Sequence, residues 1–141
     1  MRNFQILDEA RVDDETGIIQ LSVSDDIGQR PRLAMRREGN YLSISASYGP
    51  LEIAMRLEYL QVERVFSNLH PVKGLQTTRQ IGTGQAYIAA GLQEDGGLAI
   101  RPTIVADATG HLSFNLALTN AARRALFEWL SIENRNILNL S

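Results

Sequence analysis

Apolar and polar residues alternate along several short segments of the chain, which is typical of strands that bury one face. The clearest case is 112–118, where Leu112, Phe114, Leu116 and Leu118 are separated by polar or small residues. The same period of two occurs in four earlier segments, at 19–23, 32–37, 41–48 and 51–57. The residues between these segments include Gly39-Asn40 and Gly49-Pro50, which favour tight turns. Consecutive strands joined by such turns predict an antiparallel sheet.

The period changes to that of a helix after the fourth of these strands, counted from residue 19. Val62, Val65, Phe66 and Leu69 follow the spacing i, i+3, i+4 and i+7, which predicts a helix over 59–69. His70-Pro71 would end it. The β-branched valines leave an alternative, in which the preceding strand continues through Val65.

A second helix is predicted over 121–132, with Thr119 or Asn120 as its N-cap. Leu126, Trp129 and Leu130 share one face and place the single tryptophan of the chain on the buried side. Arg123-Arg124 lies opposite and is expected on a solvated face. Phe127 falls outside the buried stripe.

The second half of the chain resembles the first in its pattern, because segments 17–69 and 77–132 each predict several strands followed by a helix. Pro102 cannot donate a backbone hydrogen bond and predicts a sheet edge or a bulge. Residues 1–16 are mixed and acidic and are expected to form a loosely tied segment. We therefore expect one α+β domain over 1–141: a mainly antiparallel, bent sheet or partial barrel of seven to eight strands, with a helix after the fourth strand and a C-terminal amphipathic helix.

Two units of four strands and a helix resemble, in pattern only, the Whirly type of single-strand-binding fold. A run of strands followed by one helix that carries a tryptophan also resembles the pleckstrin-homology-like barrels. Neither resemblance extends to a sequence motif, so neither assigns a role to any residue of this chain.

Composition narrows the class of protein. No cysteine is present, which excludes disulfides and thiolate metal sites. No apolar stretch is long enough for a membrane helix, and the first residues lack the apolar core of a signal peptide. A cytoplasmic protein without membrane contact is the expectation.

The charge distribution is unusual in one respect. The formal net charge of -2 gives no general attraction to nucleic acid or to an anionic membrane. The basic residues are almost all arginine, with Lys73 as the single lysine. Arginine suits bidentate contacts to phosphate or carboxylate, but codon usage in a GC-rich genome would give the same bias.

Candidate catalytic and cofactor groups are few. His70 and His111 have no carboxylate at helical or hairpin spacing, which argues against a catalytic pair or a metal site. The loop at 77–85, with Gly82-Thr83-Gly84 and Arg79, could hold an anion through backbone N–H groups. Its spacing is not that of a phosphate loop, and a bulge or connection explains it equally well. We therefore expect a protein that is not an enzyme and has no cofactor.

The first functional hypothesis is a non-catalytic binding or assembly module that contacts another protein or a second copy of itself. It depends on the surplus of apolar residues near the C-terminus, where Phe127 and Ile137 are the candidate partner surface.

The alternative is a protein that binds single-stranded DNA or RNA through a face of the sheet. Strand alternation places Arg32 and Arg36 with Ser43, Ser45 and Ser47, and Arg30 and Arg56 could join the same face. Such a face can hold phosphates with little sequence preference. Single-strand binders usually add aromatic stacking platforms, and within the hairpin only Tyr41 lies on this side of the strands.

Overall fold

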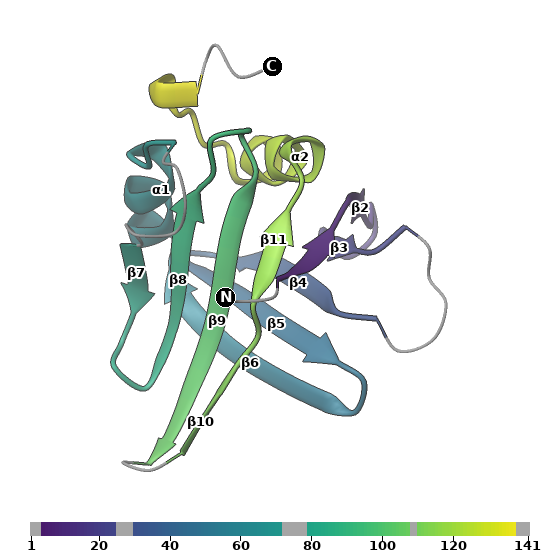
Figure 1. The fold of residues 1–141 in the computed structure, drawn as a ribbon, viewed down its shortest axis with the longest axis vertical. Helices are drawn as coiled ribbons and strands as arrows, with labels where there is room; N and C mark the ends of the chain where they lie inside the picture. Colours follow the sequence, from purple (N-terminus) through teal and green to yellow (C-terminus); the bar gives the residue numbers. More distant parts are fainter. Residues whose placement is uncertain (1–3, 25–29, 72–78, 108–109, 138–141) are drawn as a thin grey trace.

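The computed structural model describes residues 4–24, 30–71, 79–107 and 110–137. Within these ranges the chain is α+β, with mostly antiparallel strands in two facing sheets and two α-helices near one end (Figure 1). The expected fold class is confirmed at this level. The finer prediction is corrected: the described residues form eleven strands in two sheets rather than one sheet or partial barrel of seven to eight strands.

The first sheet has five strands in the order β2-β3-β4-β5-β6. Their bounds are β2 Glu9–Val12, β3 Ile19–Ser22, β4 Arg32–Glu38, β5 Tyr41–Tyr48 and β6 Leu51–Glu58. Every neighbouring pair is antiparallel, and the alternation in the sequence matches the burial of the side chains. Leu33, Met35 and Leu42, for example, point into the core between the sheets.

The second sheet has six strands, with the order β1-β11-β9-β8-β7 and with β10 paired to β9. Their bounds are β1 Gln5–Leu7, β7 Arg79–Gly82, β8 Ala86–Leu92, β9 Leu98–Asp107, β10 Gly110–Ser113 and β11 Leu116–Leu118. The segment predicted as one strand over 112–118 is thus two strands. The break lies beside Pro102, whose carbonyl accepts from the Phe114 N–H at 3.1 Å. The irregularity predicted at this proline is therefore the break between β10 and β11. β9 itself, which contains Pro102, is a central strand and not a sheet edge.

The N-terminal segment is a structural element, which corrects the expectation of a loosely tied end. β1 pairs in parallel with β11 in one sheet, and β2 pairs with β3 in the other. Asp8 stands between them, and its N–H donates to Ser22 O at 3.0 Å. These two added strands also explain why the first helix follows the sixth strand of the structure and not the fourth.

The first helix, α1 (Tyr59–Ser67), is an α-helix and not an extension of β6. It buries Tyr59, Val62 and Phe66. A buried amide from the C-terminal segment holds its end, because Asn134 Nδ2 donates to Phe66 O at 2.8 Å and to Leu69 O at 2.9 Å. The short 3-10 helix η1 (Arg135–Ile137) follows that asparagine.

The second helix, α2 (Asn120–Leu130), lies across one end of the sheets (Figure 1). The predicted N-cap is confirmed: Thr119 Oγ1 accepts from the Ala122 N–H at 3.2 Å. The predicted buried face is shifted. Phe127 is buried and stacks on Phe66 with ring centroids 5.5 Å apart, whereas Trp129 is only half-buried.

Arg123 is a further correction, because it is buried and not on a solvated face. Its Nε donates to Gly96 O at 2.8 Å, and its Nη2 donates to Asn120 Oδ1 at 2.6 Å. Its guanidinium also lies 5.2 Å from the ring centroid of Phe127. Desolvation by burial, with a smaller repulsion from Arg124, lowers the pKa of Arg123. Two carbonyl acceptors and an aromatic face thus compensate the buried charge, and no sequence pattern signals that arrangement.

Candidate binding groove

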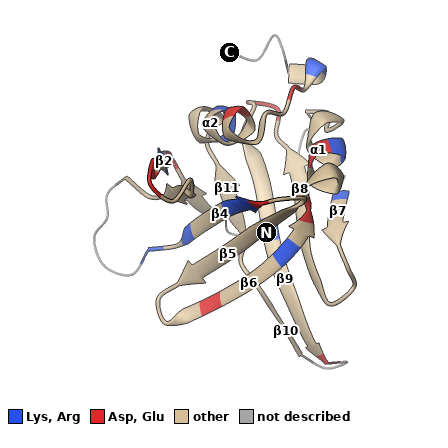
Figure 2. Cartoon of the chain, turned by 180° about the vertical axis from the view of Figure 1, so that it is seen from behind, with Lys and Arg blue, Asp and Glu red and all other residues tan. Residues whose placement is uncertain are grey.

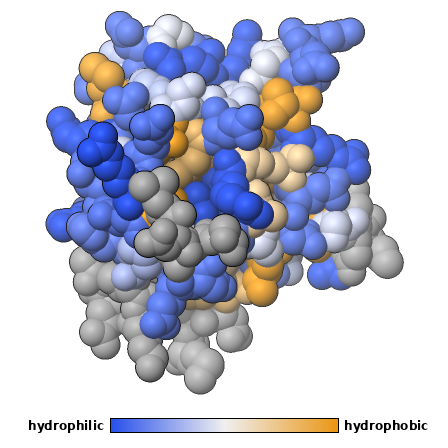
Figure 3. All heavy atoms as spheres, turned by 90° about the horizontal axis from the view of Figure 1, so that it is seen from above, coloured by the Kyte–Doolittle hydropathy of each residue, from blue (hydrophilic) through white to orange (hydrophobic). Residues whose placement is uncertain are grey.

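The partner surface expected from Phe127 and Ile137 is not available on this chain. Both side chains are buried, with 4% and 8% of their area exposed, and both belong to the core. The face of the molecule that contains α2 is largely hydrophilic, and apolar residues show in several separate places between hydrophilic side chains (Figure 3). The apolar surplus of the last helix is therefore used internally, with Phe127 packed against Phe66 of α1.

The basic face predicted on the first sheet has the expected register. Arg32 pairs with Ser47, and Arg36 pairs with Ser43, which in turn pairs with Arg56 on β6. All three arginines are exposed, as is Arg30 just before β4. Figure 2 shows basic segments on β4 and β6, each with an acidic segment on the same strand.

The centre of this face is a shallow depression of about 280 Å³. One row across the sheet consists of small residues, since Ala34 pairs with Ser45 and Ser45 pairs with Ala54. The row with Arg36 and its partners borders this floor, and Glu38, Ser43 and Ile18 also line the depression. Small side chains between longer ones are what hollows the sheet here.

Acidic and aromatic groups stand at the margin of the basic row. Glu38 has a lowered pKa, first because the Ser43 side chain donates to its carboxylate and then because Arg56 and Arg36 are near. The Arg56 guanidinium lies 4.8 Å from the ring centroid of Tyr41. An anion bound on this row would meet two guanidinium groups and would compete with Glu38 for them.

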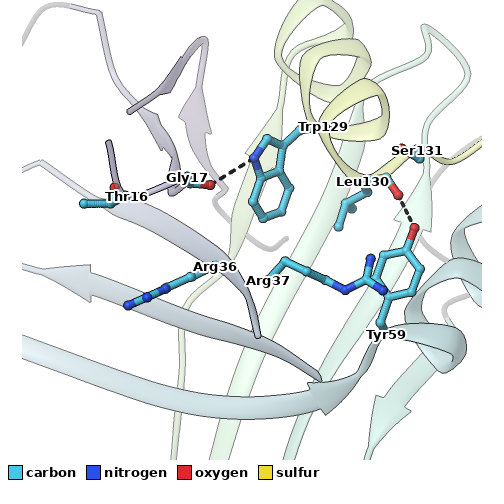
Figure 4. A pocket seen from close by; sticks show the side chains of 8 residues that line it. All are labelled: Thr16, Gly17, Arg36, Arg37, Tyr59, Trp129, Leu130 and Ser131. Carbon is cyan, nitrogen blue, oxygen red and sulfur yellow. Dashed lines mark hydrogen bonds between the residues drawn. The ribbon is translucent and has the colours of Figure 1, made fainter. Parts of the chain in front are cut away.

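A second hollow, a cleft of about 220 Å³, lies beside the first (Figure 4). Its walls come from the β2–β3 turn, from β4, from the start of α1 and from the end of α2. The lining residues are Thr16, Gly17, Arg36, Arg37, Tyr59, Trp129, Leu130 and Ser131.

Hydrogen bonds and ring contacts hold the cleft walls in place. Trp129 Nε1 donates to Gly17 O at 3.2 Å, and the Tyr59 hydroxyl donates to Leu130 O. The Arg37 guanidinium lies 3.4 Å from the ring centroid of Tyr59. Figure 4 shows Arg36 and Arg37 extending to opposite sides, with the Trp129 ring between Gly17 and Leu130.

Arg36 belongs to both hollows, and we call the combined feature the Arg36 groove. It comprises the depression floored by Ala34, Ser45 and Ala54 together with the cleft at Trp129. Sequence reasoning finds the basic face but misses the cleft, because Trp129 is 93 positions beyond Arg36 and its helical spacing assigns it to the core. One feature of the sequence could have indicated it: the helix has more apolar residues than one buried face needs, because Phe127 lies outside the stripe of Leu126, Trp129 and Leu130.

The 77–85 loop and the two histidines are the other candidate sites. The described part of the loop has an ordinary structural role, and each histidine is an isolated exposed residue. In the 77–85 loop, residues 77 and 78 lie outside the described residues, and 79–82 form β7. Thr83 Oγ1 accepts from the N–H groups of Gln85 and Ala86 at 3.2 and 3.1 Å, so a hairpin turn already uses these donors. His70 and His111 are exposed.

Two further observations apply to the described part of the chain alone. It contains no group of three or more His, Asp or Glu side chains that could hold a metal ion. None of its helices has the length and apolar character needed to span a membrane.

No protein-family model, curated protein sequence or solved structure matches the chain.

Proposed function

We propose that this protein is a non-catalytic binding module for single-stranded DNA or RNA, with the Arg36 groove as its binding surface. The observation that carries the proposal is the position of Arg36. This side chain joins a basic face, suited to phosphates, to a cleft that contains a half-buried tryptophan. Binding of a single strand without sequence preference needs both a basic track and aromatic surfaces.

The groove suits an extended strand better than a compact anion. Arg36 on β4 and Arg56 on β6 lie in one row across the sheet, with Ser43 of β5 between them. Their guanidinium groups can bind phosphate oxygens in a planar, bidentate way. The net charge of -2 gives no general attraction to a nucleic acid, and Glu38 beside both arginines opposes an anion on this row.

Fluorescence anisotropy of a labelled oligothymidylate tests this function, at low and at physiological salt. The double variant Arg36→Gln/Arg56→Gln should bind more weakly. Its slope of log affinity against log salt should become shallower by about 0.7 for each phosphate that the variant no longer binds. A control with the same change in charge is Arg124→Gln/Arg135→Gln, on exposed positions of α2 and η1. Absence of binding at low salt, or equal weakening in both double variants, would reject the proposal.

The interaction-module hypothesis stays as a second candidate on a different surface. Tyr48 and Leu51 pair with each other at the tip of the β5–β6 hairpin, and 41% and 51% of their areas are exposed. Apolar side chains on a projecting hairpin favour contact with a second copy of the chain. Sedimentation should then show a dimer that Tyr48→Ser/Leu51→Ser converts to a monomer. The control Leu60→Ser changes an exposed leucine on α1, and a monomeric wild type would reject this candidate.

A further inference from the structure

We propose that the cleft at Trp129 takes one unstacked nucleobase of the bound strand, while Arg36 holds the phosphate next to it. This inference rests on the proposed function and adds a specific role for the cleft. It makes the protein sensitive to the presence of a base at one position, in addition to the charge of the backbone.

The size of the cleft favours a single ring. Its volume of about 220 Å³ is below the roughly 300–1,000 Å³ of pockets that enclose drug-sized molecules. A planar base is the part of a nucleotide that fits such a space, with the sugar and phosphate left outside. Trp129 provides the aromatic wall for the base and Leu130 adds an aliphatic side, whereas the Tyr59 ring lies under the Arg37 guanidinium.

The walls are also fixed before a ligand arrives. Trp129 is held by its hydrogen bond to Gly17 O, and Tyr59 is held by Leu130 O and by the Arg37 guanidinium. Fixed walls reduce the entropy that binding would otherwise lose. Because Arg37 is stacked on Tyr59, we assign the neighbouring phosphate to Arg36, which extends to the other side (Figure 4).

The rest of the groove does not offer an equivalent site for a base. The floor of the depression consists of Ala34, Ser45 and Ala54, and the aromatic ring at its margin, Tyr41, lies beneath Arg56. Bases that cross the depression therefore have little to stack on, and one base at the cleft should supply most of the stacking contribution.

The test compares two labelled strands of equal length, one an oligothymidylate and the other abasic along its whole length. Both carry the same phosphates. Anisotropy should show that the oligothymidylate binds about tenfold more tightly, as expected for one stacked base. The intrinsic fluorescence of Trp129, the single tryptophan, should be quenched by the oligothymidylate and unchanged by the abasic strand.

Two variants of Trp129 and one control test whether the Trp129 ring causes the difference between the two strands. Trp129→Leu should remove the difference between the two strands, and Trp129→Phe should retain most of it because the ring remains. The control Tyr48→Leu removes an aromatic residue outside the groove and should leave the difference unchanged. If Trp129→Leu fails to fold, the quenching comparison on the wild type decides alone.

The outcomes separate the two proposals. Equal binding of both strands without quenching would overturn the base site and leave the phosphate-binding function in place. Absence of binding by either strand would overturn both. Tighter binding of the oligothymidylate with unchanged Trp129 fluorescence would place the base elsewhere and would also overturn the inference.

Discussion

The two sheets of this protein differ most on the faces that point away from the core. The five-stranded sheet has Arg32, Arg36 and Arg56 there, with serines between them and Ala54 exposed. The six-stranded sheet has Ala89, Ala99 and Ala117 on its corresponding face, and all three are buried although they lie outside the main hydrophobic cluster. One sheet thus offers long polar side chains for contact, whereas small buried residues occupy the middle of the other, beside exposed Ile6 and Gln80.

This difference explains where sequence reasoning succeeds. In 19–58 one face is apolar and the other polar, so the period of two predicts the strands and the register that places Arg36 beside Ser43. In 86–92 both faces are apolar or small, and a continuous apolar run contains no information on which side faces the core.

The helix α2 is attached to both sheets, and the two attachments should differ in strength. At one end Arg123 donates to Gly96 in the β8–β9 turn, and at the other Trp129 donates to Gly17 in the β2–β3 turn. The first bond is charged and buried, while the second is partly exposed. Arg123→Met should lower the free energy of unfolding by about 2–3 kcal/mol, because Gly96 O loses its donor.

Urea denaturation measures this decrease, with two matched variants. Arg124→Met removes an exposed arginine from the next position and should change stability by no more than about 0.5 kcal/mol. Trp129→Phe removes the other attachment and should cost roughly 1 kcal/mol. A larger decrease for Trp129→Phe than for Arg123→Met would mean that the five-stranded sheet holds the helix.

A pair of identical substitutions tests the contrast between the outer faces directly. Ala99→Glu introduces a carboxylate between Gly91 and Ala117, its neighbours across the sheet, and should cost about 1–2 kcal/mol in desolvation. Ala54→Glu makes the same change at an exposed position of β6 and should alter stability by no more than about 0.5 kcal/mol. Thermal unfolding of both variants gives the comparison. Equal effects would show that the two faces have the same environment.

Particular residues show what a single sequence can and cannot reveal about the groove. Strand alternation identifies Arg36 and Arg56 because their partners lie on hairpins, where contacts are close in sequence. The cleft depends on contacts between Trp129, Gly17 and Tyr59, which lie far apart along the chain and follow no period. The pairing of β1 with β11 has the same character. The prediction for Phe127 is wrong because its partner, Phe66, lies on another helix and not on a sheet.

The smallest expected effect concerns Glu38 on the five-stranded sheet. Its charge should contribute to stability but oppose the binding of an anionic strand. A donor from Ser43 and the nearby Arg56 and Arg36 lower the pKa of this exposed carboxyl group. Its stabilising contribution is therefore present at neutral pH and is lost as the pH falls through the lowered pKa. An anionic strand needs the same two arginines, so Glu38 should oppose binding.

Glu38→Gln should accordingly strengthen oligothymidylate binding about two- to fivefold, the range expected for an exposed charge interaction. The carboxylate at Glu52 lies opposite Ser47, farther along the hairpin, and Glu52→Gln serves as the control with the same change in net charge. Anisotropy at constant salt should show a larger gain for Glu38→Gln. Acidification of the wild type should reduce the gap to Glu38→Gln as Glu38 becomes protonated. Equal gains in the two variants would indicate a response to total charge alone, and the strand would then have no defined position over Arg36 and Arg56.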